Sequence, residues 1–116
     1  MAAVRPTVPA TLNVVSGVDT EILRSGIPAL VISIVVQVTT AITTAGTLII
    51  RSGGSGGAQV YPSVSSGTAV ATTTFDLPEE GIISDGLYLD ITAATGGAGT
   101  WFVYYKKLPY GNVQNG

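Results

Sequence analysis

One stretch without any charged residue, residues 25–50, most constrains what this chain can fold into. It is "SGIPALVISIVVQVTTAITTAGTLII", and it is long enough for a transmembrane helix, which needs about 20 mostly apolar residues. From residue 27 to residue 50, however, 15 of 24 residues are Ile, Val or Thr. Their branched side chains favour strands over helices. The stretch therefore predicts buried strands, and a membrane-spanning helix is the weaker interpretation.

The alternation of side chains within this stretch indicates which side of the strand is buried. A period of two with one wholly apolar side is typical of a strand that packs against a core. We expect the apolar side to face the core and the mixed side to face outward. The apolar side holds Leu30, Ile32, Ile34, Val36 and Val38, and the mixed side holds Val31, Ser33, Val35, Gln37 and Thr39.

Similar patterns continue along the chain between glycine-rich and proline-containing segments. Residues 47–51 are predicted to return as the hairpin partner of the long strand 29–40, with Leu48 and Ile50 facing the core. Further strands are expected at 11–17, 69–77, 87–92 and 100–107, and no window has helical periodicity. Residues 78–86 are interpreted as a turn-rich connection in which Ser84–Gly86, "SDG", forms a tight turn.

These patterns predict an all-β fold, a single antiparallel β-sandwich of jelly-roll or Greek-key type with six to eight strands. A chain of 116 residues has room for one core. We expect the sandwich to cover residues 11–108. Residues 1–10 are predicted to form an extended N-terminal arm because Pro6 and Pro9 favour extended geometry in the residues before them. Residues 109–116 are expected to form a flexible C-terminal tail.

The composition argues against several kinds of function. The chain has no cysteine and no histidine, so thiol chemistry and the commonest general base and transition-metal ligand are missing. Five basic residues against seven acidic ones are too few and too scattered for a nucleic-acid surface. Charged residues make up 10% of the chain, against about 25% in ordinary soluble domains. We expect no cofactor, no nucleic-acid partner and no membrane partner.

Two motifs have a chemical interpretation that the rest of the chain does not support. Residues 53–57, "GGSGG", match the nucleophile elbow G-x-S-x-G, but no histidine and no following helix accompany them. A hairpin tip is the better interpretation. The only carboxylate cluster is expected to serve solvation and turns rather than catalysis or a divalent ion. It consists of Asp76, Glu79, Glu80, Asp85 and Asp90.

The last predicted strand is apolar or aromatic on both sides. Trp101, Val103 and Tyr105 share one side, while Phe102, Tyr104 and Lys106 lie on the other. A strand of this kind usually has both faces covered, so we expect a loop, the arm or another subunit over the second face. The alternative is that the tyrosine rings simply coat an exposed surface. The candidate interface residues are Val4, Arg5, Pro6, Val8, Val31, Val35, Tyr88, Phe102 and Tyr104.

Residues 77–106, "LPEEGIISDGLYLDITAATGGAGTWFVYYK", have a recognisable order: a turn ending in G-I, a polar step, D-G-L-Y-L, a glycine-rich loop and a closing V-Y-Y strand. This order resembles small β-sandwich structural proteins of tailed-phage virions, of the capsid cement, decoration or knob type. The resemblance covers about a quarter of the chain well and carries no catalytic residue. The matching positions, which it implies are structural, are Gly81, Ile82, Gly86, Leu87 and Tyr88.

The resemblance implies a non-enzymatic capsid decoration or cement protein that stabilises the exterior of the virion head. Its expected partners are further copies of itself, as a homotrimer, and the major capsid protein or another virion protein. The arm is the segment expected to reach a neighbour. The alternative is a carbohydrate- or receptor-binding module of a virion fibre, knob or tail, which would use Tyr88, Trp101 and Tyr104.

Overall fold

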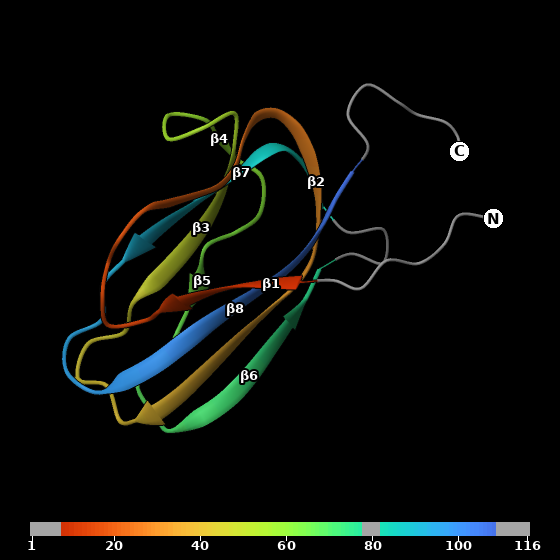
Figure 1. The fold of residues 1–116 in the computed structure, drawn as a ribbon. Helices are drawn as coiled ribbons and strands as arrows, with labels where there is room; N and C mark the ends of the chain where they lie inside the picture. Colours follow the sequence, from red (N-terminus) through yellow and green to blue (C-terminus); the bar gives the residue numbers. More distant parts are fainter. Residues whose placement is uncertain (1–7, 78–81, 109–116) are drawn as a thin grey trace.

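The computed structural model describes residues 8–77 and 82–108. All the secondary-structure elements in these ranges are β-strands (Figure 1). Within these ranges no helix is long and apolar enough to cross a membrane. The strands are β1 (Val8–Asn13), β2 (Thr20–Thr40), β3 (Thr47–Ser52), β4 (Ala58–Gln59), β5 (Val64–Ser65), β6 (Ala71–Asp76), β7 (Ile82–Thr92) and β8 (Ala98–Lys107).

All eight strands belong to one antiparallel sheet in which β2 is shared between two groups of neighbours. The strand order is β1-β8-β2-β7-β3-β4, with β6 paired to β2 and β5 paired to β3. The N-terminal half of β2 pairs with β7, and its C-terminal half lies between β8 and β6. We call β1, β8, the C-terminal half of β2 and β6 the β8 layer. The N-terminal half of β2, β7, β3, β4 and β5 form the β7 layer.

A bend in the middle of β2 carries the chain from one layer to the other (Figure 1). Gly26 takes a positive φ of 99° there, which glycine adopts without steric cost. The carboxylate of Asp85 in β7 fixes the bend: the Gly26 N–H donates to its Oδ1 at 2.7 Å and the Ser25 hydroxyl to its Oδ2 at 3.1 Å. The β2–β7 register is irregular between Glu21 and Pro28, where this bend lies.

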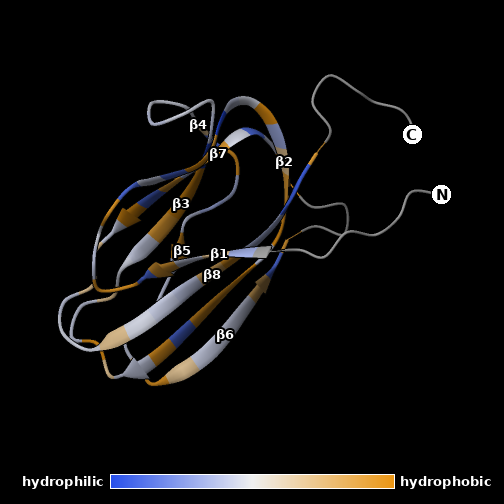
Figure 2. Cartoon of the chain, viewed as in Figure 1, coloured by the Kyte–Doolittle hydropathy of each residue, from blue (hydrophilic) through white to orange (hydrophobic). Residues whose placement is uncertain are grey.

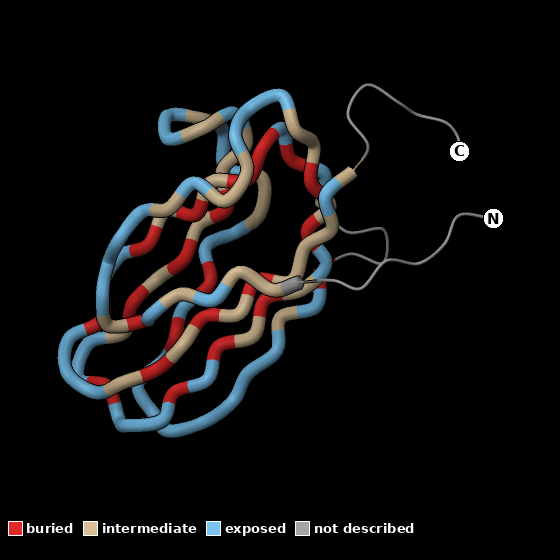
Figure 3. The backbone as a smooth tube through the Cα atoms, in the orientation of Figure 1, coloured by how far each residue is buried: buried red, intermediate tan, exposed pale blue. Residues whose placement is uncertain are grey.

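The two layers bury alternate side chains in one hydrophobic core (Figure 3). Branched and aromatic residues fill it, and hydrophobic residues make up about half of β2 and half of β3 (Figure 2). Trp101 of β8 is fully buried. The fully buried apolar side chains are Val14, Ala29, Val31, Ile34, Leu48, Leu89, Trp101 and Val103, each with an exposed fraction of 0%.

A bulge in β2 explains why one predicted face is wrong. Val31 pairs with Tyr105 and Ser33 with Tyr104, so Ile32 is an extra residue on the β2 side of the ladder. An extra residue inverts the side-chain alternation on one side of the bulge. Ile34, Val36 and Val38 face the core as predicted, but Val31 is buried instead of outward and Ile32 is 38% exposed.

Two further local predictions are wrong. Residues 47–51 do form a strand with Leu48 and Ile50 inward, but β3 pairs with β7, β4 and β5 and not with β2. The C-terminal half of β2 already has β8 and β6 on its two edges, so no edge is left for β3. Ser84–Gly86 is not a turn but part of β7, and Gly86 uses its positive φ of 76° inside the strand.

The all-β antiparallel prediction with six to eight strands is confirmed. The alternation predicted for 87–92 and 100–107 is confirmed, since Leu87, Leu89, Ile91, Trp101 and Val103 are buried. The jelly-roll or Greek-key order stays a prediction, because the two layers are halves of one hydrogen-bonded sheet. Residues 8–10 of the predicted arm belong to β1; residues 1–7 and the tail 109–116 lie outside the described residues.

Gly86→Ala tests the contact between β7 and the bend. A Cβ at this position would lie 2.7 Å from the Arg24 carbonyl oxygen, and φ is positive. We expect the free energy of unfolding to fall by about 1–3 kcal/mol, measured by urea denaturation. Gly56→Ala is the matched control, because nothing lies within 4 Å of a Cβ there, and it should change stability little. Equal effects of the two substitutions would contradict this account of the bend.

Val31→Ala and Val35→Ala test the inverted alternation. Val31 is fully buried, whereas Val35 is half-buried on the outer side. Loss of buried methyl groups and the resulting cavity should cost about 2 kcal/mol at Val31. The cost at Val35 should be well below that. Thermal unfolding of both variants measures the difference. A larger loss of stability in Val35→Ala than in Val31→Ala would contradict the burial of Val31 and the bulge at Ile32.

Candidate functional site

The outer face of the β8 layer brings together three of the predicted interface residues. Directly opposite residues of an antiparallel pair lie on the same face with Cβ atoms about 5 Å apart. Val35 of β2 is opposite Phe102 of β8, and Ser33 is opposite Tyr104. All four side chains are half-buried. We call Ser33, Val35, Phe102 and Tyr104 the outer patch.

The surroundings of the outer patch are almost free of charge. The next positions across the layer are Thr11 and Pro9 on β1, opposite Phe102 and Tyr104, and Thr74 and Asp76 on β6, opposite Val35 and Ser33. The row beyond them holds Asn13, Thr100, Gln37 and Thr72. Asp76 is therefore the only ionic side chain in these three rows, and Lys106 of β8, opposite Leu30, is the next residue on the Tyr104 side. A face of this composition pays little electrostatic desolvation cost when another surface covers it.

The outer face of the β7 layer is the opposite in character. Glu21, Tyr88 and Arg51 lie in one row across β2, β7 and β3. The Arg51 guanidinium contacts the Asp90 carboxylate, with its Nη2 2.9 Å from Oδ2 and its Nε donating to the same oxygen at 2.9 Å. Both side chains are about a quarter exposed, so the pair adds modest stability. Charged side chains keep this face solvated.

Tyr88 belongs to this charged face and not to the outer patch. Partial desolvation raises the pKa of Tyr88 above its ordinary value of 10.0, and the carboxylates of Asp19 and Asp90 raise it further. The Arg51 guanidinium opposes this shift. Tyr88 therefore stays neutral and can donate a hydrogen bond at any physiological pH.

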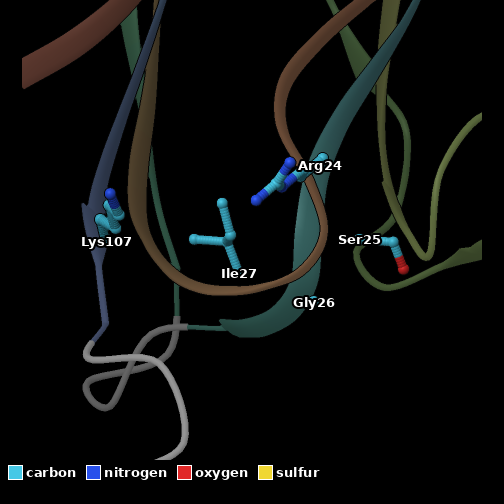
Figure 4. A pocket seen from close by; sticks show the side chains of 5 residues that line it. All are labelled: Arg24, Ser25, Gly26, Ile27 and Lys107. Atoms are coloured by element: carbon cyan, nitrogen blue, oxygen red, sulfur yellow. The ribbon is translucent and has the colours of Figure 1, made fainter.

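A basic hollow lies where the bend of β2 meets the end of β8. It has a volume of about 650 Å³ and is lined by Arg24, Ser25, Gly26, Ile27 and Lys107. Figure 4 shows that the side chains of Arg24 and Ile27 point into it and that Ser25 points away. The Asp85 carboxylate nearby is occupied by the Gly26 N–H and the Ser25 hydroxyl. The hollow carries positive charge from Arg24 and Lys107.

The structure separates the six predicted site residues that it describes into four groups. Val35, Phe102 and Tyr104 share the outer patch, and Tyr88 lies on the outer face of the other layer. The prediction that Val31 belongs to an interface face is wrong, because the bulge at Ile32 turns it into the core. The backbone of Val8 in β1 pairs with Tyr105 of β8. Val4, Arg5 and Pro6 lie outside the described residues.

Trp101 does not join any surface. Its side chain has an exposed fraction of 0%, and its Nε1 has no hydrogen-bond partner among the described residues. The sugar-stacking platform of Tyr88, Trp101 and Tyr104 is therefore wrong as a joint surface, because the three side chains lie on one outer face, in the core and on the other outer face. Ring stacking on a ligand needs exposed ring faces.

The carboxylate cluster is dispersed. Asp85 fixes the bend, Asp90 pairs with Arg51 and Asp76 lies on the β6 edge. Glu79 and Glu80 fall in the range 78–81, which the structure does not describe. In the described part of the chain no three potential ligands gather in a metal-binding group.

Sequence reasoning missed Ile32 and the basic hollow. Ile32 projects at the bulge beside the outer patch, and no pattern distinguishes it from Val31 because both are branched apolar residues. Arg24 and Lys107 are far apart in the chain and line the same hollow only because the bend lies beside the end of β8. Comparison of the chain with protein-family models, with curated proteins and with solved structures finds no match.

Asp19→Asn tests the electrostatics around Tyr88. Asn keeps the Oδ1 atom that accepts from the Ile91 N–H at 2.9 Å but removes the charge that raises the Tyr88 pKa. We expect this pKa to fall toward 10.0, measured by ¹³C NMR titration of the tyrosine ring. Asp76→Asn, on the other layer, should leave it unchanged; an unchanged pKa in Asp19→Asn would contradict the assignment.

The raised Tyr88 pKa also determines how the stability of the folded state changes with pH. A group whose pKa is higher in the folded state stabilises that state below its unfolded pKa, and the contribution is lost as the pH rises through the folded pKa. Wild-type protein should therefore lose stability above pH 10.0. Tyr88→Phe should lose less over the same range, as measured by denaturant unfolding at a series of pH values.

Proposed function

We propose that the protein is a non-enzymatic structural component of a phage virion, a decoration or cement protein on the head exterior that works as a homo-oligomer. One observation carries the proposal. The outer patch lies on a face where Asp76 at the β6 edge and Lys106 near the end of β8 are charged and the other positions are apolar, aromatic or neutral, while the opposite outer face holds an ion pair and further acidic groups. The neutral face is the one suited to lie against another protein.

The chemistry of the described residues fits a role that depends on contact area. Aromatic residues such as Phe102 and Tyr104 supply large contact areas, and interface centres are typically poor in charge and rich in aromatic side chains. The outer patch has this composition. Burial of such a face contributes roughly 25 cal/mol per Å² of apolar surface. The partner proposed for it is the major capsid protein or another virion protein.

The resemblance of residues 77–106 to phage structural proteins supports the same assignment. Its D-G-L-Y-L segment forms the part of β7 where Gly86 lies against the bend and Leu87 and Leu89 enter the core. These are structural roles, as the resemblance implies. The receptor-binding alternative finds no comparable support, since Trp101 is buried and Tyr88 lies on the charged face.

Val35→Lys and Ile49→Lys test which face contacts the particle. Both residues are half-buried and branched, but Val35 lies in the outer patch and Ile49 lies on the charged face opposite Asp90. A lysine at Val35 should weaken attachment to purified particles at least tenfold, because a charge would have to be desolvated. Attachment is measured by co-sedimentation with particles lacking the protein.

Ile49→Lys is expected to attach as the wild type does. Equal loss in both variants would show that the outer patch is not the contact face. Absence of the protein from purified virions, measured by mass spectrometry, would overturn the proposed function itself.

A further inference from the structure

The β6 strand forms an edge of the β8 layer that has no neighbour among the described residues. β6 pairs with β2 alone, and five of its six side chains are exposed; Phe75 is half-buried. The Leu77 N–H donates to the Ile32 carbonyl at 3.3 Å, which marks this pair as hydrogen-bonded. Because hydrogen-bonded and non-hydrogen-bonded pairs alternate in an antiparallel ladder, the N–H and C=O groups of Thr72, Thr74 and Asp76 point away from β2.

This edge lacks the devices that usually prevent strand addition. Proteins blunt edges with Pro, charged side chains (Lys above all), bulges or very short strands, and the one charged residue of β6 is Asp76 at its C-terminal end. β6 is six residues long, contains neither Pro nor Lys, and keeps a regular register from Ala71 to Asp76. The three threonines in its centre are β-branched and suit a strand.

The other edge of the same layer is protected. The Val14 N–H donates to the Gly99 carbonyl at 3.1 Å, so in β1 the outward positions are Pro9, Thr11 and Asn13. Pro9 has no N–H to donate there. A head-to-tail contact that joins β1 of one copy to β6 of the next would therefore lose a hydrogen bond.

The residues of β6 are compatible with antiparallel pairing to themselves. With Thr74 opposite Thr74 of a second copy, Thr72 lies opposite Asp76, so no two like charges meet. Threonine pairs directly across strands are favourable. On the inner side Phe75 lies opposite Thr73, which is exposed in the single chain, and each ring would cover the neighbouring threonine.

We propose that β6 is a strand-addition site whose partner is β6 of a second copy, related by a twofold axis through Thr74. The contact joins two β8 layers into one sheet and extends the neutral outer face across both copies. It makes the basic assembly unit a dimer in place of the trimer that the sequence suggested. The inference rests on the proposed homo-oligomeric function but not on attachment to a virion.

Thr74→Pro tests the site without removing a hydrogen bond inside the chain, because the Thr74 N–H points outward. Wild-type protein should have a solution mass of two 11.8 kDa chains by light scattering, and Thr74→Pro should have the mass of one. Thr11→Pro is the matched control: it is the same change at an outward position of the opposite edge, and it should remain a dimer. Circular dichroism checks that each variant is folded.

A cysteine placed at Thr74 gives a second measurement that does not depend on proline. The chain has no cysteine, and hydrogen-bonded opposite residues have Cα atoms about 5.5 Å apart, within the range that a disulfide spans. Thr74→Cys should form a disulfide-linked dimer under mild oxidation, whereas Thr11→Cys should stay uncrosslinked.

Three outcomes would overturn the inference: a monomeric wild type, a Thr74→Pro protein that is still dimeric, or disruption by Thr11→Pro as well as Thr74→Pro. The last result would identify a head-to-tail ring through β1 and β6. Particle attachment is measured separately, so a monomer that still binds particles would refute the dimer and leave the proposed function standing.

Discussion

The fold depends on β2 having a hydrogen-bonded neighbour in both layers. A strand of 21 residues is far longer than the five or six residues usual in globular proteins, and a single flat layer of this size could not bury it well. The bend at Gly26 divides the strand, and the Asp85 carboxylate holds the bend in place. Because each half of β2 supplies the central contacts of one layer, loss of the bend would separate both layers from their common core. We therefore expect the two layers to unfold together.

The distribution of charge follows from the same arrangement. Each layer has one face in the core and one face outside, and the two outer faces are built from different strands. The face formed by β2, β7 and β3 carries Arg51 and Asp90, while the face formed by β2 and β8 carries Val35, Phe102 and Tyr104. A chain with 10% charged residues thus concentrates much of its charge on one side. The other side, where the charged residues are Asp76 and Lys106, is left for protein contacts, and the open β6 edge borders it.

The sequence predicted those elements whose alternation is uninterrupted. Leu87, Leu89 and Ile91 face the core as expected because β7 is regular after Gly86. Val31 was assigned to the wrong side because the bulge at Ile32 changes the register between two apolar residues, which a period of two cannot detect. The partner of β3 was also missed, since pairing between distant strands depends on which edges remain free.

The candidate site was predictable only in part, for related reasons. Phe102 and Tyr104 lie two residues apart on one regular strand, so their common face could be read from the sequence. Their contact with Val35 depends on the β2–β8 register, and the basic hollow depends on the bend. The free edge of β6 depends on the complete strand order. A strand has a free edge only if no other strand pairs with that side of it, and this cannot be known until every pairing is known.

Trp101 gives the molecule a built-in optical reporter. It is the only tryptophan in the chain, it lies opposite Leu12 of β1 and Val36 of β2, and water does not reach it. Its indole emission should be shifted to short wavelength in the native state and should move to long wavelength when the strands around it separate. Because both neighbours belong to the β8 layer, the signal reports the integrity of the layer that bears the outer patch, and it does so without any label on the surface.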